Sequence, residues 1–298
     1  MTGKERGFLL LASQLGDRNC RPLSAAQLRS LAGRVQCMEK PAQDRVLLSS
    51  DVMALGYRED MAKRILELLD REELLDHYLD RGRKLGCVPL TRVSPGYPVC
   101  VRKRLGLEAP GCLWAKGDPE LLDAPKVALV GSRDILERNR KFAEEVGFQA
   151  ARQGFVVVSG NARGADRAAQ EACLRAGGRV IIVVADQLDK QPQRDGVLYL
   201  SEECYDGEFS AQRALSRNRV IHSLGQGVFV AQCGYQNGGS WDGTVKNLRF
   251  GWSPVRCFDD GSPAMELLAQ MGAELVRLEE LADLAALTKG ERTLFDGL

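Results

Sequence analysis

Short apolar runs rich in Val and Ile alternate with segments of helical periodicity from Lys126 onward. The apolar runs predict strands at 127–131, 155–159, 180–185, 197–200, 227–231, 254–258 and 274–278. The segments between them predict helices near 136–153, 164–176, 210–224, 241–250, 263–271 and 279–287. Continuously apolar strands separated by helices are typical of a parallel sheet covered on both faces. We therefore predict an α/β fold with a doubly wound, mostly parallel sheet.

The first 125 residues have a different pattern. Ser24 and Gln27 have the spacing of a capping box, and apolar residues recur at helical spacing across 61–69. Residues 86–125 are rich in Pro and Gly, which favours a connecting segment with one or two short strands. The sequence thus predicts a small helical domain at 1–85, a connecting segment at 86–125 and the α/β domain at 126–298.

Net charge, cysteine content and the length of the apolar runs exclude several classes of protein. The 298-residue chain has a net charge of +1, so any binding to a polyanion must come from a local arrangement of charge. Its nine cysteines include no Cys-x-x-Cys pair and it has only two histidines, so we expect reduced thiols and no metal site. No apolar run is long enough to span a membrane and no signal-peptide cleavage site follows the N-terminus. We expect a cytoplasmic protein with no membrane association.

Two Gly-rich turns follow predicted strands. Residues 131–133 are Gly-Ser-Arg, and residues 159–166 are Ser-Gly-Asn-Ala-Arg-Gly-Ala-Asp. Backbone amides at a helix start together with a guanidinium suit a phosphate, and such sheets bind ligands at the carboxyl ends of their strands. The alternatives are a plain turn and a helix start in need of a cap. Asp166 is placed either to cap that helix or to hold Arg163.

Two further segments carry similar chemistry. Residues 217–219 are Arg-Asn-Arg in a predicted helix, where the two arginines lie roughly 200° apart. They fit either an exposed charged face or a clamp on an extended phosphate ligand. A third Gly-rich turn spans 234–244, after the strand at 227–231. Three such turns on one edge of one sheet favour a phosphate-binding edge.

From about Tyr97 to Leu278 the chain resembles the DprA/Smf family of bacterial DNA-processing proteins. The motifs agree in order and spacing: Tyr97-Pro98, Leu113-Trp114-Ala115-Lys116-Gly117, Val130-Gly131-Ser132-Arg133, the segment 159–166, Ser201-Glu202, Arg217-Asn218-Arg219, and Gly239-Ser240 followed by Thr244. The resemblance implies an extended Rossmann-like domain preceded by a small helical domain of the SAM or helix-hairpin-helix type. We do not expect the family's frequent C-terminal winged helix in this chain, because about 20 residues follow Leu278.

The resemblance implies binding of single-stranded DNA, delivery of that strand to a RecA-type recombinase during transformation or recombination, and a homodimer. It implies no catalytic residue and no cofactor. The positions implied to line the DNA path are Gly131, Ser132, Arg133, Ser159, Gly160, Arg163, Gly164, Arg217, Asn218, Arg219, Gly239 and Ser240. Serines and amides would position phosphates, arginines would supply charge, and bases would stack rather than be read at their edges. The aromatic candidates are Phe209, Tyr235 and Trp241, residue types that more often belong to a core.

Some positions depart from the family pattern. The family usually has Leu at the position of Asn161, Gly-Leu-Asp where this chain has a segment beginning at Asp186, and an acidic residue at the position of Ala231-Gln232. The tract 233–237 is also unusual. These departures lie in the expected pocket, and they indicate a divergent member of the family.

A second hypothesis is a nucleotide-handling protein of the same superfamily. A nucleotide sensor, or a LOG-type nucleoside-monophosphate phosphoribohydrolase, would also place Gly-rich turns on phosphates. The hydrolase needs a carboxylate and an Arg at the glycosidic bond, and Glu202 or Asp242 with Arg133 are the candidates. The LOG signature is only partly matched by residues 238–244, which lack its Pro. A nicotinamide or flavin enzyme is disfavoured because no Gly-x-Gly-x-x-Gly follows the first strand.

Overall fold

A computed structural model describes residues 1–36 and 47–289. The chain forms two compact units. Unit 1 comprises Met1–Tyr97, Pro110–Trp114 and Glu202–Asp206, and unit 2 comprises Pro98–Ala109, Ala115–Ser201 and Gly207–Leu298. The eight cysteines in the described ranges are free thiols, and Cys37 lies outside those ranges, as does the end of the α/β domain expected at 126–298.

Unit 1 is built mainly from helices, which are α1 (Gly3–Ala12), α2 (Ala25–Gln36), α3 (Ser49–Ala54), α4 (Glu59–Leu69) and α5 (Glu72–Lys84). The capping box before α2 is confirmed, because Gln27 N donates to Ser24 Oγ at 3.3 Å and Ser24 N donates to Gln27 Oε1 at 2.9 Å. Part of the unit's core consists of Leu23, Val52, Ala62, Ile65 and Leu68. Ala62, Ile65 and Leu68 recur every three residues along α4, so this helix buries one face.

The segment between the helical region and Lys126 contains β1 (Cys87–Thr91), α6 (Val99–Leu105), the short 3₁₀ turns η1 (Gly106–Glu108) and η2 (Pro119–Leu122), and β2 (Cys112–Lys116). The two short strands agree with the prediction, whereas α6 was not predicted. This helix is only seven residues long and lies between Pro98 and Gly106, whose φ is +53°. A segment that short between two helix-breaking residues has too few turns to show a helical period.

Within residues 1–36 and 47–289 the sheet has nine strands in the order β1-β2-β6-β5-β4-β3-β7-β8-β9. The strands of its parallel part are β3 (Lys126–Val130), β4 (Val156–Ser159), β5 (Arg179–Val184), β6 (Val197–Glu202), β7 (Gly227–Val230), β8 (Val255–Phe258) and β9 (Glu274–Val276). All neighbours from β6 to β9 pair in parallel. Every residue of β3, β4 and β7 is buried, which agrees with the prediction of a parallel sheet covered on both faces.

The helices after Lys126 are α7 (Glu137–Arg152), α8 (Ala165–Arg175), α9 (Ala211–Leu224), α10 (Gly239–Phe250), α11 (Pro263–Gln270) and α12 (Leu284–Leu287). The single helix predicted at 279–287 was wrong, since a 3₁₀ turn, η3 (Leu278–Asp283), precedes α12. The Asp283 side chain accepts from Ala286 N at 2.9 Å, so it caps a new helical turn and divides the segment.

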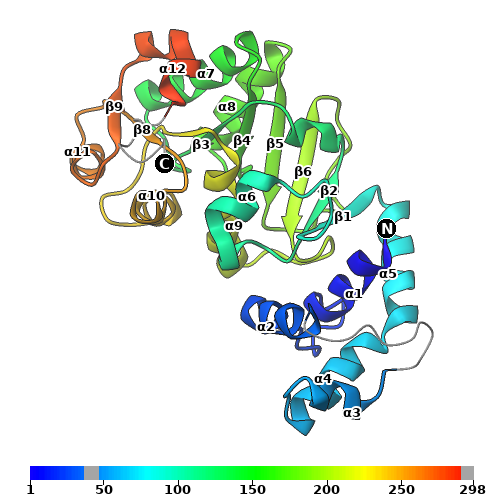
Figure 1. The fold of residues 1–298 in the computed structure, drawn as a ribbon. Coiled ribbons are helices and arrows are strands. Elements are labelled where there is room, and N and C mark those ends of the chain that lie inside the picture. Colours follow the sequence, from blue (N-terminus) through cyan, green and yellow to red (C-terminus); the bar gives the residue numbers. More distant parts are fainter. Residues whose placement is uncertain (37–46, 290–298) are drawn as a thin grey trace. The chain divides into compact units, whose positions relative to one another are not determined.

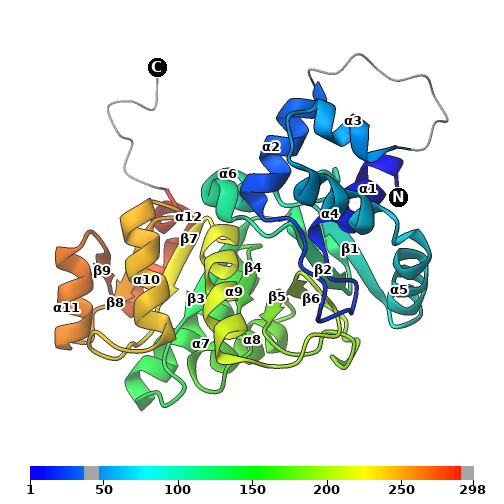
Figure 2. The same cartoon turned by 90° about the horizontal axis from the view of Figure 1, so that it is seen from below.

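The strand order locates the binding edge of unit 2. From β3 the chain proceeds through β4 and β5 to β6 on one side, then returns to place β7 on the other side of β3. Right-handed crossovers then put α7 and α8 on one face of the sheet and α9 and α10 on the other, as Figures 1 and 2 show. The order reverses at β3, so the carboxyl ends of β4, β3 and β7 lie next to one another at the switch point where such folds bind ligands.

Candidate functional site

Three loops meet at the carboxyl ends of β4, β3 and β7, and we call them together the loop edge: residues 160–164, 131–136 and 231–238. Ser132 N donates to Gln232 O at 2.9 Å. Ser240 Oγ donates to Gly131 O at 2.8 Å, and Ala165 N donates to Ser132 O at 3.2 Å. The structure therefore brings the Gly-Ser-Arg turn of β3 against both of the other Gly-rich turns.

Glycines are needed at the loop edge because the loops pack against each other. A Cβ on Gly164, which has a φ of +90° and precedes α8, would collide with the carbonyl oxygens of Ser132 and Arg133. A Cβ on Gly131 would overlap the Cβ of Ala165. Packing within the protein, against backbone at Gly164 and against the Ala165 side chain at Gly131, thus accounts for these two glycines.

The β4–α8 loop is closed by Asp166. Its buried carboxylate accepts from Gly160 N at 3.0 Å and from Ala162 N at 3.2 Å. Both roles considered for Asp166 were wrong, because no side chain caps the start of α8 and Arg163 pairs with Asp134 instead. Burial raises the pKa of Asp166, and the nearby Arg217 guanidinium opposes that shift. Between the two donors Asn161 has a φ of +62°, a left-handed conformation that Asn tolerates better than the Leu usual in the family.

Two predicted arginines are exposed at this edge. Arg133 is exposed on the β3–α7 loop. Arg163, on the β4–α8 loop, is also exposed and forms an ion pair with Asp134. Since Asp134 follows Arg133 directly, this pair links the two loops at their solvent side. Both cations are thus available at the surface where an anionic ligand would arrive.

Two other predicted residues are inside the fold. Ser159 is 0% exposed and its Oγ accepts from Gln170 Nε2. Arg217 is 8% exposed, and its Nη1 donates to Gly160 O at 2.6 Å and to Val183 O. The sequence suggested an exposed face or a phosphate clamp for Arg217, and the exposed face is wrong because the guanidinium bonds carbonyls at the ends of β4 and β5.

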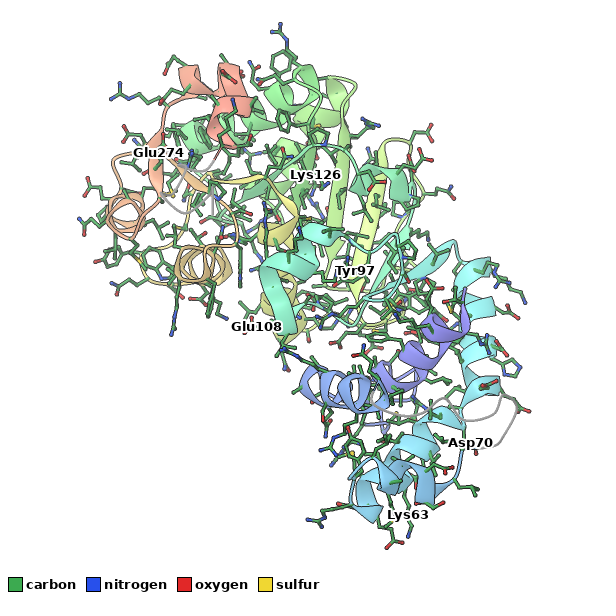
Figure 3. All side chains as sticks on the ribbon, viewed as in Figure 1. Lys63, Asp70, Tyr97, Glu108, Lys126 and Glu274 are labelled. Atoms are coloured by element: carbon green, nitrogen blue, oxygen red, sulfur yellow. The ribbon has the colours of Figure 1, made fainter. Side chains whose placement is uncertain are left out.

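The remaining predicted residues join α9 to its neighbours. Asn218 Nδ2 donates to Gly239 O at 3.1 Å, which ties α9 to the start of α10. Arg219 Nε donates to the carbonyl oxygen of Glu108, labelled in Figure 3, at 2.9 Å. The side chains of Arg217 and Arg219 therefore extend from different sides of α9, as expected from their angular separation.

Two residues that support the strand ends and the loop edge were not predicted from the sequence. Arg213 Nε donates to Ala185 O at 3.1 Å and its Nη2 to Ser201 Oγ at 3.0 Å, at the ends of β5 and β6. The i, i+4 spacing between Arg213 and Arg217 places both on one face of α9 and was the available signal.

The second is Gln232, which sequence analysis noted only as a departure from the family. Its Oε1 accepts from Leu136 N at 2.9 Å and its Nε2 donates to Asp134 O at 3.3 Å. An amide can donate and accept at once, whereas the usual carboxylate only accepts. Gln232 therefore holds both ends of the 134–136 segment.

The described residues also include a hollow outside the loop edge, and they contain no candidate metal site and no membrane-spanning helix. A hollow of about 680 Å³ is lined by residues of α7 and α8 with Leu278 and Glu279, and by none of the predicted site residues. Within residues 1–36 and 47–289 no group of three or more His, Cys, Asp or Glu is arranged to hold a metal ion. The same ranges contain no helix with the length and hydrophobicity of a membrane span.

A doubly wound parallel sheet whose Gly-rich loops gather at the switch point defines a Rossmann-like ligand-binding protein. Residues 89–286 match the family described as DNA recombination-mediator protein A. The chain belongs to this family, as the DprA/Smf motifs in its sequence predicted.

Three relatives show how far the similarity extends. The DNA processing protein DprA of Streptococcus pneumoniae is 37% identical over 141 residues, which cover 44% of this chain and 50% of that protein. The X-ray structure of DprA from S. pneumoniae has a TM-score of 0.71 and 26% identity, over 96% of this chain and 98% of that one. DNA processing protein A of Helicobacter pylori, whose structure is described as giving insights into a unique single-stranded DNA binding mode, has a TM-score of 0.56 and 23% identity, over 67% of this chain and 95% of that one. The H. pylori comparison shows a shared fold.

Proposed function

We propose that this chain binds single-stranded DNA along the loop edge, mainly through its phosphates. The observation that carries the proposal is the pair of exposed guanidinium groups, Arg133 and Arg163, on two loops that are bonded to one another. The H. pylori relative, described as a single-strand binder, supports the same ligand class.

In this proposal exposed arginines of the loop edge bind phosphate, and buried or half-buried residues hold the strand ends and the loops in place. Arg133 and Arg163 supply the charge that attracts phosphates, so affinity should fall steeply with salt. Arg213 and Arg217 hydrogen-bond carbonyl oxygens at the strand ends, and Gln232 hydrogen-bonds the backbone of the β3–α7 loop. A preorganised loop set loses little entropy when a strand binds. Because phosphates carry no sequence information, the binding should be nearly independent of base sequence.

Asp134 lies on the same surface, and its carboxylate competes with phosphate for Arg163. Its carboxylate occupies Arg163 in the absence of DNA. A phosphate at Arg163 competes with this carboxylate, and a strand that offers several phosphates at once overcomes that competition better than an isolated anion does. This competition supports an extended polyanion over a mononucleotide.

The wider role follows from the family. We propose that the bound strand is protected and passed to a RecA-type recombinase in the cytoplasm, that the protein acts as a homodimer, and that it binds DNA without catalysing a reaction. The similarity to DNA processing proteins of S. pneumoniae supports this assignment.

The test is equilibrium binding to a labelled oligo-dT strand of about 30 nucleotides, compared with a duplex of equal length. We expect tighter binding to the single strand, and a negative slope of log affinity against log salt whose size reports the number of phosphates contacted. Replacing Arg133 and Arg163 together by Ala should reduce that slope by about one to two and weaken binding to all sequences.

A matched control is Arg175→Ala, because Arg175 is an exposed, ion-paired arginine at the far end of α8. Its loss should leave affinity unchanged. Tight binding of a mononucleotide with no affinity for single strands would instead identify a nucleotide sensor, and release of a free base from a nucleoside monophosphate would identify a hydrolase.

A further inference from the structure

The loop edge carries an exposed aromatic ring that the phosphate contacts do not use. Tyr235, in the β7–α10 loop, is 58% exposed. Aromatic residues make up only 6% of the chain, and the other site residues predicted from the sequence are Gly, Ser, Asn and Arg. Those residues suit phosphates but offer the bases no apolar surface.

The ring is held in place by a tight turn. Gly234 and Asn237 form an antiparallel bridge, so Tyr235 and Gln236 occupy the two central positions of the turn. Gln236 has a φ of +50°, a conformation that costs energy for a non-glycine residue. The Tyr235 ring packs against Trp241, with ring centroids 6.3 Å apart and planes tilted by 43°. Trp241 is itself 8% exposed, so the exposed ring rests on a buried one.

Both ends of this loop are tied to the Gly-Ser-Arg turn. Gln232, three residues before Tyr235, accepts through its carbonyl oxygen from Ser132 N at 2.9 Å. Ser240, next to Trp241, donates to Gly131 O at 2.8 Å. The ring is therefore coupled on either side to the turn that presents Arg133.

We propose that Tyr235 is a stacking platform for a base of the bound single strand, beside the phosphates held at Arg133 and Arg163. The inference rests on the proposed single-strand binding and adds to it a residue from the unusual 233–237 tract. Stacking on an aromatic ring tolerates every base, since each has a π face, and it is strong enough to contribute measurably to single-strand affinity.

Binding of the full chain to oligo-dT and to an abasic strand of the same length separates base contacts from phosphate contacts. Tyr235→Ala should weaken oligo-dT binding by about 5- to 100-fold, the range for loss of one stacked base, and leave abasic-strand affinity and the salt slope unchanged. Tyr235→Phe and Tyr235→Trp should retain affinity for oligo-dT.

Phe250→Ala is the matched control, because Phe250 is 55% exposed and packs on the buried Trp252 at the opposite end of α10. It should bind both strands as the unmodified protein does. Equal weakening of both strands by Tyr235→Ala, no weakening of either, or a change of oligomeric state in size-exclusion chromatography would overturn the stacking proposal. If the unmodified protein did not bind oligo-dT, this result would instead contradict the proposed single-strand binding on which the stacking proposal rests.

Discussion

Gly164 lies against the carbonyl oxygen of Ser132, so closely that the backbone of the β4–α8 loop and that of the β3–α7 loop leave no room for a side chain. Ala165 N then donates to the same oxygen at 3.2 Å. This contact joins the two loops that carry Arg133 and Arg163. The packing of the two backbones therefore sets the distance between the loop positions of these arginines.

Gly164→Ala should therefore unfold at lower denaturant concentration and bind single-stranded DNA more weakly. The left-handed backbone alone costs an L-residue about 1–2 kcal/mol, and the collision with Ser132 and Arg133 adds to it. Gly177→Ala is the control, because Gly177 has a φ of +77° but open space around its Cα. Chemical denaturation should show the smaller loss for Gly177→Ala, with DNA affinity kept. Equal losses in the two variants would contradict the packing argument.

Asp134→Asn should tighten binding to single-stranded DNA by about 2- to 5-fold at low salt. The change removes a negative charge and frees Arg163 from an exposed ion pair, whose strength is at most about 1 kcal/mol. Glu171→Gln is the control, since it breaks the exposed Glu171–Arg175 pair within α8. Fluorescence anisotropy titrations would measure both, and weaker binding by Asp134→Asn would show that Asp134 positions the loop rather than competes with phosphate.

Arg217→Met should destabilise the protein by about 1–3 kcal/mol without reducing the salt slope of DNA binding. Its loss strips hydrogen bonds from the buried carbonyls of Gly160 and Val183, and a buried acceptor left unpaired costs energy of that order. Denaturant titration gives the stability, and affinities at several salt concentrations give the slope. A slope reduced by about one in a variant of unchanged stability would assign Arg217 to phosphate binding.

Stability should fall as the pH decreases from 6.5 toward 4 because of His222. This residue is fully buried, and burial lowers its pKa from 6.5 to about 4. Since the folded-state pKa is the lower one, the unfolded chain takes up the proton first. Stability is then complete above pH 6.5 and declines by up to about 3 kcal/mol by pH 4.

Denaturant unfolding at several pH values would measure this decline. His222→Gln should flatten it over that range, although it lowers stability at pH 7 by disturbing the contact of His222 Nδ1 with Asn247 Nδ2 at 3.2 Å. His77→Gln should keep the decline, because His77, the other histidine, is exposed. An unchanged pH profile in His222→Gln would assign the decline to carboxylates.

Local sequence determined most of the secondary structure and the positions of the Gly-rich turns. Val-rich runs buried on both faces became β3, β4 and β7, within one residue of the predicted bounds. Ser24 and Gln27 formed the expected cap, because that bond needs only neighbours three residues apart. The Gly-Ser-Arg turn and the turn after β4 likewise follow their strands as predicted, since strand, turn and helix are adjacent in sequence.

Which of those residues lie at the surface was decided by tertiary structure. Ser159 and Arg217 belong to the family motifs just as Ser132 and Arg133 do, yet the first two are buried and Arg133 is exposed. Arg217 finds its acceptors 57 and 34 residues away, at Gly160 and Val183, and the Ser132–Gln232 bond joins residues 100 positions apart. Such partners become neighbours only when parallel strands pair across long crossovers, so no local pattern records them. Local patterns thus specify the strands, helices and Gly-rich turns of a DNA-processing family member. The strand order of the folded sheet determines which arginines hold the loops together and which remain at the surface.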